Sequence, residues 1–554
     1  MKRLIASVLV FALLCSCSLF SPEAFAASGT TYYVDSVAGD DANSGISEDA
    51  AWKTIEKASE NTYAAGDKIL FKAGGVYIGT FTARGSGTAE QPITISAYGD
   101  TETDGLPLLT TQEDTMLIFI HNVSGWCIEN LEMTAPHGMG IQIIADNEIG
   151  VMKDFTIRNC EMHDIRYEKV SRNPGDSYSC IYISSSGPNA LIENVTISDM
   201  NMYNSFRGIA TFGVAIEWHR DIFVSPEESY NRNFLFENIT MNNILYDAVI
   251  ITAILGLTVR NCALLNTALE TDWYTAPMWS HHAKYMLIEN CEIAGSTNIM
   301  DGMAVDFDGW TTDSTYQYVY SHDNIRFMNN CVYDDTTKNA NCTVRYCLSV
   351  NDNKAESSAA QLLSTPVYDY TINNDWSKSM ENFKFYNNTI VNGSNIRFTQ
   401  VSNSYVANNI FYSEDINQFF RIGSFGKTDD GKIFIRKFTG EFTNNCFYGC
   451  SIPLQAKKSV NRDPLFVGTD FTDKNSFKLA ANSPLLGKGV QVEEDMGAYD
   501  FYGNPLTDTH NIGCYDGAGE DVVIEKSFAD SMADFFKLLG GYIVGMVKTV
   551  IEAF

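Results

Sequence analysis

Ile128-Glu129-Asn130-Leu131 is the first copy of a four-residue phrase, apolar–charged–Asn–apolar, that returns along the chain. Later copies are Ile157-Arg158-Asn159-Cys160, Ile192-Glu193-Asn194-Val195, Phe236-Glu237-Asn238-Ile239, Val259-Arg260-Asn261-Cys262 and Ile288-Glu289-Asn290-Cys291. Degenerate copies follow at residues 316–319, 344–347, 385–389 and 406–410. From Asn130 to Tyr346 the third positions lie 29, 35, 44, 23, 29, 28 and 28 residues apart. A fixed phrase at variable spacing indicates a structural repeat with loops of different length between its copies.

A second strand-like run lies between the copies and is often entered through a small residue. Examples are Gly140-Ile141-Gln142-Ile143, Cys180-Ile181-Tyr182-Ile183 and Ala248-Val249-Ile250-Ile251. Alternation with period two predicts strands with one buried face. Because no amphipathic helix separates consecutive strands, a βαβ sheet is excluded. The pattern predicts an all-β β-solenoid with two or more short strands in each turn.

The repeated Asn residues are expected to stack as an amide ladder at one corner of the solenoid, bonding to backbone from turn to turn. Cysteines that directly follow this position would stack inside as small hydrophobic residues; they are Cys160, Cys262, Cys291 and Cys347. Eleven cysteines remain once residues 1–26 are set aside, and an odd number in so long a chain does not suggest a disulfide scaffold.

The N-terminus has the features of an export signal. Lys2 and Arg3 precede an apolar run over residues 4–14, and small residues at 24–26 predict cleavage before Ala27. Alternatively, residues 14–17 form a lipobox that would lipidate Cys17 and tether the protein to a membrane. The chain is therefore expected to be secreted or held at the cell surface, with residues 1–26 as signal peptide and 27–519 as β-solenoid.

Residues 520–554 form the third expected segment, because their apolar residues recur at helical spacing. This predicts an amphipathic helix that lies on the flank of the solenoid, with membrane-surface or partner docking as the alternative. Gly540-Gly541 is expected to weaken or kink it. Residues 56–60 predict a short helix that caps the N-terminal end.

A formal charge of −30 is spread along the chain. This field repels nucleic acid and anionic membrane surfaces, so no nucleic-acid partner is expected. It also opposes polyanionic glycans unless Ca²⁺ or a local basic groove mediates the contact. The acidic stretch 35–45 could bind Ca²⁺, although a solvated N-terminal turn is the preferred interpretation. The protein is expected to be a monomer.

Both ends of the expected solenoid carry recognisable motifs. Near the start are Tyr32-Tyr33-Val34-Asp35, Gly39-Asp40-Asp41, Asn43-Ser44-Gly45 and Trp52-Lys53-Thr54-Ile55; near the end are Ser483-Pro484-Leu485 and Asp495-Met496-Gly497-Ala498-Tyr499. The chain thereby resembles secreted bacterial pectin-lyase-like proteins from its mature start to about Gly519. The resemblance implies a single-stranded right-handed parallel β-helix and a carbohydrate-active function. It does not specify the reaction, since this fold carries lyases, hydrolases, epimerases and adhesins.

Residues with catalytic chemistry concentrate between Asp272 and Asp323. If Met303 and Val305 point inward, Asp306 and Asp308 point outward, roughly 6–7 Å apart. Two carboxylates at such a distance suit glycoside hydrolysis, although a solvated acidic face is the alternative. In the preceding turn, Ser280 and His282 are expected at comparable outward positions. The candidate catalytic set is Asp301, Asp306, Asp308 and His282.

Flat aromatic rings that can stack on a sugar lie in the same region: Trp273, Trp279 and Trp310. Glu217-Trp218-His219, in a long loop, is a second candidate for the wall of a cleft. By contrast, His163-Asp164 and His322-Asp323 follow strands in the same form and are attributed to turns.

Pectate lyases of family 9 carry an Asp-Gly-aromatic-Ala-x-Lys run whose lysine removes the proton. Asp301-Gly302-Met303-Ala304-Val305-Asp306 resembles it but ends in an acid, and a carboxylate is a poor base for that step. The sequence therefore favours a glycoside hydrolase. A Ca²⁺-assisted polysaccharide lyase remains an alternative, with Arg207, Lys284 or Arg326 as its basic residue. A non-catalytic glycan-binding or adhesin-like surface protein is the third interpretation.

Overall fold

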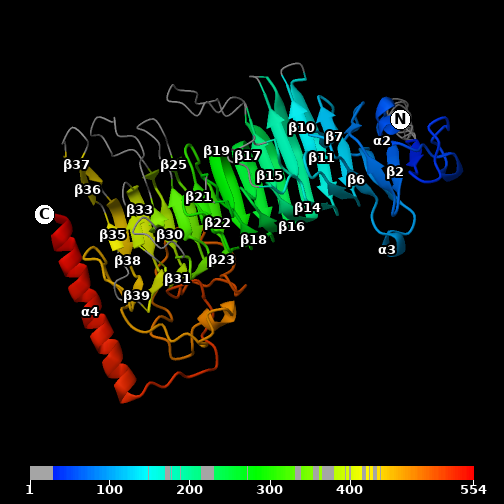
Figure 1. Ribbon diagram of the computed structural model, residues 1–554. Helices are drawn as coiled ribbons and strands as arrows, with labels where there is room; N and C mark the ends of the chain where they lie inside the picture. The colour runs from blue at the N-terminus through cyan, green and yellow to red at the C-terminus, as the bar shows by residue number, and fades with distance from the viewer. Residues whose placement is uncertain are drawn as a thin grey trace, which may run out of the picture.

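The computed structural model describes residues 29–553 apart from 147–148, 169–174, 176, 187–188, 214–229, 271–272, 331–338, 354–360, 365–379, 394, 399–400, 415–419, 423, 428–432 and 437. In this part of the chain, 37 strands form one continuous parallel system that winds along an elongated molecule (Figure 1). The predicted signal peptide, with Cys17, lies outside the described residues, as does the Glu217-Trp218-His219 loop.

The strands of the first half are β1 (Thr31–Val34), β2 (Lys68–Lys72), β3 (Val76–Ile78), β4 (Phe81–Thr82), β5 (Ile93–Tyr98), β6 (Leu108–Thr110), β7 (Met116–His121), β8 (Trp126–Glu129), β9 (Glu132–Thr134), β10 (Met139–Ala145), β11 (Val151–Arg158), β12 (Glu161–His163), β13 (Ile181–Ser185), β14 (Leu191–Ser205), β15 (Ile209–Phe212), β16 (Asn231–Ile244), β17 (Val249–Arg260) and β18 (Ala263–Thr267). Those of the second half are β19 (Met278–Glu289), β20 (Glu292–Ala294), β21 (Met303–Phe307), β22 (Thr315–Gln317), β23 (Tyr320–His322), β24 (Arg326–Asn330), β25 (Asn339–Ala340), β26 (Thr343–Arg345), β27 (Leu348–Val350), β28 (Gln361–Ser364), β29 (Met380–Glu381), β30 (Lys384–Tyr386), β31 (Thr389–Val391), β32 (Asn395–Phe398), β33 (Val401–Ala407), β34 (Ile410–Tyr412), β35 (Phe420–Ile422), β38 (Phe438–Thr443) and β39 (Cys446–Tyr448). A separate antiparallel hairpin joins β36 (Ser424–Lys427) and β37 (Ile433–Arg436).

One column of buried apolar side chains shows how the rungs stack. Each member lies directly opposite the next in the parallel register, and the column comprises Ile95, Ile128, Ile157, Ile197, Phe236, Val259, Ile288, Tyr316, Val344, Phe385, Val406 and Phe442. Because parallel strands pair backbone to backbone between turns, each turn supplies the hydrogen bonds and the apolar contacts of the next. The predicted β-helix is confirmed.

The corner ladder is real, but one predicted member is wrong. Ile157 lies opposite Ile197, so Asn159 is followed by Asp199 rather than by Asn194, which stacks on Asp154 instead. The ladder residues share a left-handed backbone with φ between 49° and 57°; they are Asn130, Asn159, Asp199, Asn238, Asn261, Asn290, Tyr318, Tyr346, Asn387, Asn408 and Asn444. Asn and Asp tolerate this conformation best, which explains the repeated residue. Asn194 was assigned to this ladder because it occurs in the same four-residue sequence pattern, although it lies at a second corner of the same turn.

Inside the ladder, the residue that follows each corner is buried. Cys160, Cys262, Cys291 and Cys347 are at most 4% exposed, as predicted, and the ten described cysteines are free thiols. In the last turns this position holds asparagines: Asn409 Nδ2 donates to the Phe385 carbonyl at 2.9 Å and to Asn445 Oδ1 at 3.0 Å. An internal amide ladder thus continues where the cysteine stack ends.

The N-terminal end is closed by α2 (Ile55–Glu60), which matches the predicted cap; its first turn is capped by the Thr54 hydroxyl. A 3-10 helix, η1 (Glu48–Ala50), and a short helix, α3 (Thr101–Asp104), lie nearby. Asp41 accepts hydrogen bonds from the Lys53 and Thr54 backbone and from the Thr54 hydroxyl, so its carboxylate organises the 35–45 turn.

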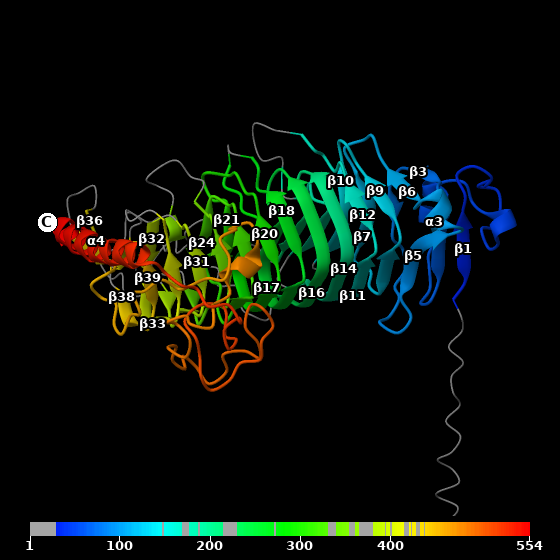
Figure 2. The same ribbon diagram turned by 90° about the horizontal axis from the view of Figure 1, so that it is seen from below.

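After β39, residues 449–527 fold back over the flank of the late rungs, where Figure 1 draws them in orange, and include η4 (Lys474–Phe477). Gly513 N donates to the Asn408 carbonyl at 2.7 Å and Arg345 donates to the Asp495 carbonyl at 2.9 Å, which attaches this segment to the ladder side. The chain ends in α4 (Phe528–Ala553), which lies along the C-terminal edge of the molecule (Figures 1 and 2).

Contrary to expectation, α4 runs unbroken through Gly540-Gly541. A Cβ at Gly541 would lie 2.6 Å from the Cys450 carbonyl oxygen, and one at Gly545 would lie 2.2 Å from that of Ile452. The glycines therefore allow close approach to the solenoid rather than bending the helix. Among the residues described, none of the helices is long and apolar enough to cross a membrane.

Candidate active site

The outer face of β21 and its neighbours positions the acidic residues. Val305 and Phe307 belong to the core, and Asp306 alternates with them, so its side chain faces outward. Ser280 lies opposite Phe307, and Asp306 lies opposite Asn329. Continuing the register by one residue places Trp279 beside Asp306. Since Ile250 pairs with Trp279, the outer face here carries Ile250, Trp279, Asp306 and Asn329 in successive turns.

The predicted outward position of Ser280 is wrong. Ser280 is fully buried and bonds to the Asp306 carbonyl at 3.1 Å and to the Thr311 hydroxyl at 3.1 Å. The prediction assigned it the same alternation as His282, but His282 has a φ of 50°, and this left-handed residue interrupts the alternation. Ser280 therefore supports β21 from within instead of lining the outer face.

Three carboxylates in and around β21 interact electrostatically: Asp301 precedes the strand, Asp306 lies in it and Asp308 follows it. Burial, and then the neighbouring charge of Asp308, raise the pKa of Asp301 to about 7. The Arg326 guanidinium opposes this rise and the Asp247 carboxylate adds to it. Asp301 keeps partial contact with solvent, whereas Asp306 and Asp308 are 4% and 8% exposed. At neutral pH, Asp301 is therefore close to half protonated and accessible, as a catalytic acid requires.

Asp306 is buried more deeply. Burial, with the charges of Asp308 and Asp301 next, raises its pKa well above the ordinary value, which favours its neutral form. Its Oδ1 is buried without a hydrogen-bond partner. Asp308 directly follows the strand: its backbone N–H donates to the Ser280 carbonyl at 2.9 Å and its carbonyl accepts from Thr311 at 3.2 Å. The solvated acidic face considered from the sequence is not what the structure has, because both side chains are covered.

A buried ion pair supports the floor of the site. Arg207 Nε donates to Asp247 Oδ2 at 3.1 Å, and both side chains are at most 4% exposed. Asp247 Oδ1 accepts from Trp279 Nε1 at 2.9 Å and from the Ala276 N–H at 3.1 Å. Trp279 is thus fixed in orientation beside Asp306, an arrangement that the sequence did not reveal because Arg207 and Asp247 lie 40 residues apart.

Two residues after Asp308, Trp310 stacks on His282, with ring centroids 4.6 Å apart and planes 16° apart. His281 and His282 bring their Nδ1 atoms to 2.7 Å. Burial, and then His282, hold the pKa of His281 well below its usual range, so His281 is neutral at pH 7. Trp310 has a φ of 59°, a strained conformation for a bulky residue, and such strain concentrates at functional sites.

Asn298 is a site residue that the sequence analysis missed. It is fully buried; its Oδ1 accepts from the Asp301 N–H at 2.9 Å, and its Nδ2 donates to the Trp273 carbonyl at 2.6 Å. It therefore joins the Asp301 turn to the loop that presents Trp273 and Tyr274, which are 46% and 58% exposed. An Asn three residues before a candidate acid is the signal that was available, since this side chain typically organises such turns.

Other residues singled out from the sequence have partners elsewhere or lie outside the described residues. His163 bonds to Glu132 and Asp164, and His322 to Glu292 and Asp323, which fits the turn role expected for both. Lys284 Nζ lies 3.8 Å from Asp313 Oδ2. Asp272, like the Glu217 loop, lies outside the described residues. Within the described part of the chain, no group of three or more His, Cys, Asp or Glu side chains is arranged to hold a metal ion.

No protein-family model matches the chain. Over 88 residues, 15% of its length, the chain is 42% identical to the lacto-N-biosidase of Bifidobacterium longum subsp. longum; the match spans only 5% of that relative. The solved structure of the GH136 lacto-N-biosidase from Eubacterium ramulus is 21% identical in sequence and superposes with a TM-score of 0.53. The match covers 71% of this chain and 68% of the Eubacterium chain.

The solved structure of XylC with xylose is 10% identical in sequence and superposes with a TM-score of 0.51. The match covers 89% of this chain and 99% of the XylC chain. At these sequence identities, structural similarity establishes the fold but not the reaction. Taken with the continuous parallel register, they show that this chain has the right-handed parallel β-helix fold.

Proposed function

We propose that the protein is a glycoside hydrolase in which Asp301 is the catalytic acid and Asp308 is its carboxylate partner. The observation that carries this proposal is that Asp301 is largely buried next to the charge of Asp308 yet keeps contact with solvent, an environment that raises its pKa to about 7. Glycosidases need one carboxyl that is protonated near neutral pH and one nearby that is ionised, and environments that push two pKa values apart mark such a pair.

In this assignment, Asp301 donates its proton to the glycosidic oxygen as the bond to the leaving sugar breaks. Asp308 either activates a water molecule or attacks the anomeric carbon. Burial favours the neutral form of Asp306, and Arg326 provides the positive charge that keeps the pKa of Asp301 from rising further. The roles differ from the sequence hypothesis, which placed the pair at Asp306 and Asp308.

Aromatic residues near the acids in the chain support a sugar substrate. Trp310, two residues after Asp308, lies against His282, and Trp273 is exposed on the loop that Asn298 joins to Asp301. Flat rings bury the apolar face of a sugar at low entropic cost. The similarity to a lacto-N-biosidase favours an oligosaccharide that ends in lacto-N-biose.

We further propose that the enzyme acts outside the cell, because residues 1–26 have the composition of an export signal. A lyase mechanism is less well supported. Arg207 pairs with Asp247 and Lys284 lies beside Asp313, while Arg326 is the positive charge that lowers the pKa of Asp301.

The test is to incubate the protein with a panel of oligosaccharides, including some that end in lacto-N-biose, and to follow reducing ends and ultraviolet absorbance together. Asp301→Asn and Asp308→Asn should each remove turnover, while the matched control Asp323→Asn, in a turn outside the site, should retain it. An aryl glycoside with a good leaving group needs little acid assistance. Asp301→Asn should therefore keep much more activity on that substrate than Asp308→Asn.

Two outcomes would contradict the proposal. Unsaturated products that absorb in the ultraviolet would indicate a lyase. Failure to release product from every glycan of the panel, with glycan binding retained, would indicate a non-catalytic binding protein. The anomeric form of the first product, followed by NMR, then distinguishes Asp308 acting as a base from Asp308 acting as a nucleophile.

A further inference from the structure

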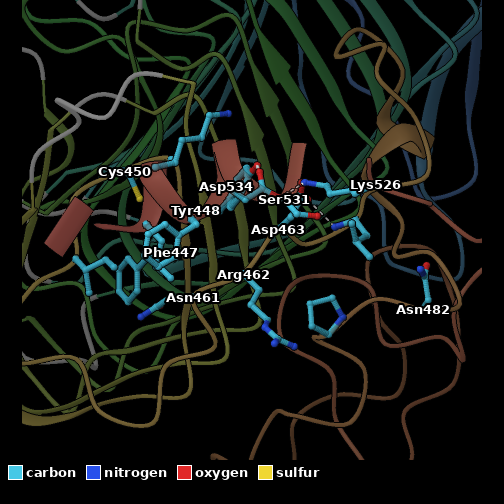
Figure 3. Close-up of a pocket in the computed structure, with 17 residues that line it drawn as sticks. Phe447, Tyr448, Cys450, Asn461, Arg462, Asp463, Asn482, Lys526, Ser531 and Asp534 are labelled. Carbon is cyan, nitrogen blue, oxygen red and sulfur yellow. Dashed lines mark hydrogen bonds and ion pairs between the residues drawn. The ribbon is translucent and has the colours of Figure 1, made fainter. Parts of the chain in front are cut away.

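The C-terminal helix α4 packs on the solenoid in an unusual way. Its inner side is narrow: Gly541 and Gly545 are buried, Leu538 packs against the hydrophobic core, and Asp534 accepts a hydrogen bond from the Tyr448 hydroxyl. Lys526 joins Asp534 to Asp463, beside a cavity of about 490 Å³ between the helix and the last turn (Figure 3). The helix is thus anchored to its own chain through Leu538, through polar groups and through close backbone contact.

The outer side of α4 is apolar. Nine large side chains are between 38% and 82% exposed: Phe528, Met532, Phe535, Phe536, Leu539, Tyr542, Ile543, Met546 and Val547. At about 200 Å² for a whole large side chain, they expose roughly 900 Å². The largest apolar patch on an ordinary monomer is about 300–600 Å². A stable dimer buries about 800 Å² on each partner, so this face is large enough to form one.

The spacing of the outer residues is that of a coiled-coil seam. Phe528, Phe535 and Tyr542 recur every seven residues, and Met532, Leu539 and Met546 recur between them at alternating steps of four and three. One seam position is therefore always aromatic, and the other is always Leu or Met.

This division makes the seam complementary to itself in one direction. If a second copy of α4 lies antiparallel with its midpoint at residue 537, the facing pairs are Phe528 with Met546, Met532 with Tyr542, and Phe535 with Leu539. Every layer then contains one aromatic and one aliphatic side chain of similar total volume. A parallel pair would alternate layers of two aromatic rings with layers of two aliphatic chains, which pack less evenly.

We propose that the protein is a two-fold symmetric dimer in which the α4 helices of two copies pack antiparallel through this seam. The partner helix presents the same patch, as isologous dimers require, and antiparallel alignment also pairs the helix dipoles favourably. An anionic membrane surface is a poorer occupant, because α4 contains two lysines against three acidic residues and the chain carries a net charge of −30. The position of α4 at the molecular edge leaves its outer side accessible (Figure 1).

The dimer is tested by sedimentation equilibrium of the purified protein. Leu539→Glu places a charge in the central layer and should raise the dissociation constant about 30-fold or more. Met546→Glu, which disrupts a terminal layer, should act in the same direction. The matched control Ala533→Glu adds the same charge to the same helix away from the seam and should leave the dimer intact. Added salt should strengthen association, since it screens the repulsion between two acidic chains.

The direction of packing is tested with a spin label at Ala529→Cys. Antiparallel pairing about residue 537 separates the two labels by about 24 Å along the helix axis, whereas a parallel pair brings them within about 15 Å. A short distance overturns the antiparallel pairing, and a monomeric wild type, or a dimer that survives Leu539→Glu, overturns the dimer. Binding of the monomer to phosphatidylcholine vesicles, abolished by Leu539→Glu, would assign the face to lipid instead.

Discussion

Replacing Asp301 by Asn should stabilise the protein while it removes the catalytic acid. In the folded protein the pKa of this carboxyl is about 7, against an ordinary value of 3.8. The difference corresponds to about 4 kcal/mol at about 1.4 kcal/mol per pKa unit. Because the side chain keeps partial contact with solvent, we expect the gain in the free energy of unfolding to be about 2 to 4 kcal/mol at pH 8.

The sign follows from proton linkage. Between pH 3.8 and 7 the folded protein binds this proton more tightly than the unfolded chain does, so wild-type stability falls as the pH rises through this range. The asparagine side chain of the Asp301→Asn variant does not titrate, so the variant does not undergo this loss of stability over this pH range. The variant should therefore match the wild type near pH 4, gain stability as the pH rises, and reach a constant advantage above pH 7.

Urea unfolding of both proteins at several pH values between 4 and 8.5 measures this advantage. In an Asp308→Asn background the gain should shrink, because Asp308 makes the largest charge contribution to the raised pKa of Asp301. An equal midpoint at pH 8, or an advantage that does not depend on pH, would refute the claim that burial and Asp308 hold this proton.

Three further predictions concern the scaffold. Asp247→Ala removes the carboxylate partner of Arg207, which is 1% exposed, and should lower the free energy of unfolding by about 3–5 kcal/mol, measured by urea unfolding; a loss below 1 kcal/mol would mean that other contacts hold this guanidinium. Asn409→Ala removes the side chain that donates to the buried Phe385 carbonyl and accepts from the buried Asn388 N–H, and should cost about 1–3 kcal/mol. Asn403→Ala, which removes an exposed hydrogen bond to the Asn382 side chain, should cost less than about 1 kcal/mol in the same assay. Gly545→Ala forces a Cβ against the Ile452 carbonyl and should release α4, seen as faster proteolysis of the C-terminal segment than in the Ala533→Ser control; equal cleavage rates would show that the backbone yields at this point.

Most of the architecture could be read from local patterns. The β-helix, the corner ladder, the inward cysteines and the capping helix rest on repeats and alternation within a few residues, and these patterns are what set strand faces and turns. The exception, Asn194, shows the limit of this reasoning. A phrase identifies a type of corner, but the register with the next turn decides which corner it occupies.

The candidate site was located in sequence but not resolved into roles. The sequence by itself determined that acids and tryptophans gather between residues 272 and 323 on the outer side of neighbouring turns. Only the tertiary structure decided that Ser280 faces inward, that Asn298 holds Asp301, and that Arg207 and Asp247 fix Trp279. The choice of Asp301 over Asp306 as the acid likewise depends on how deeply each carboxyl is buried and which charges surround it. Strand alternation is a local property of the chain, whereas burial and electrostatic environment are set by residues from distant turns, and for that reason the fold was predictable and the chemistry was not.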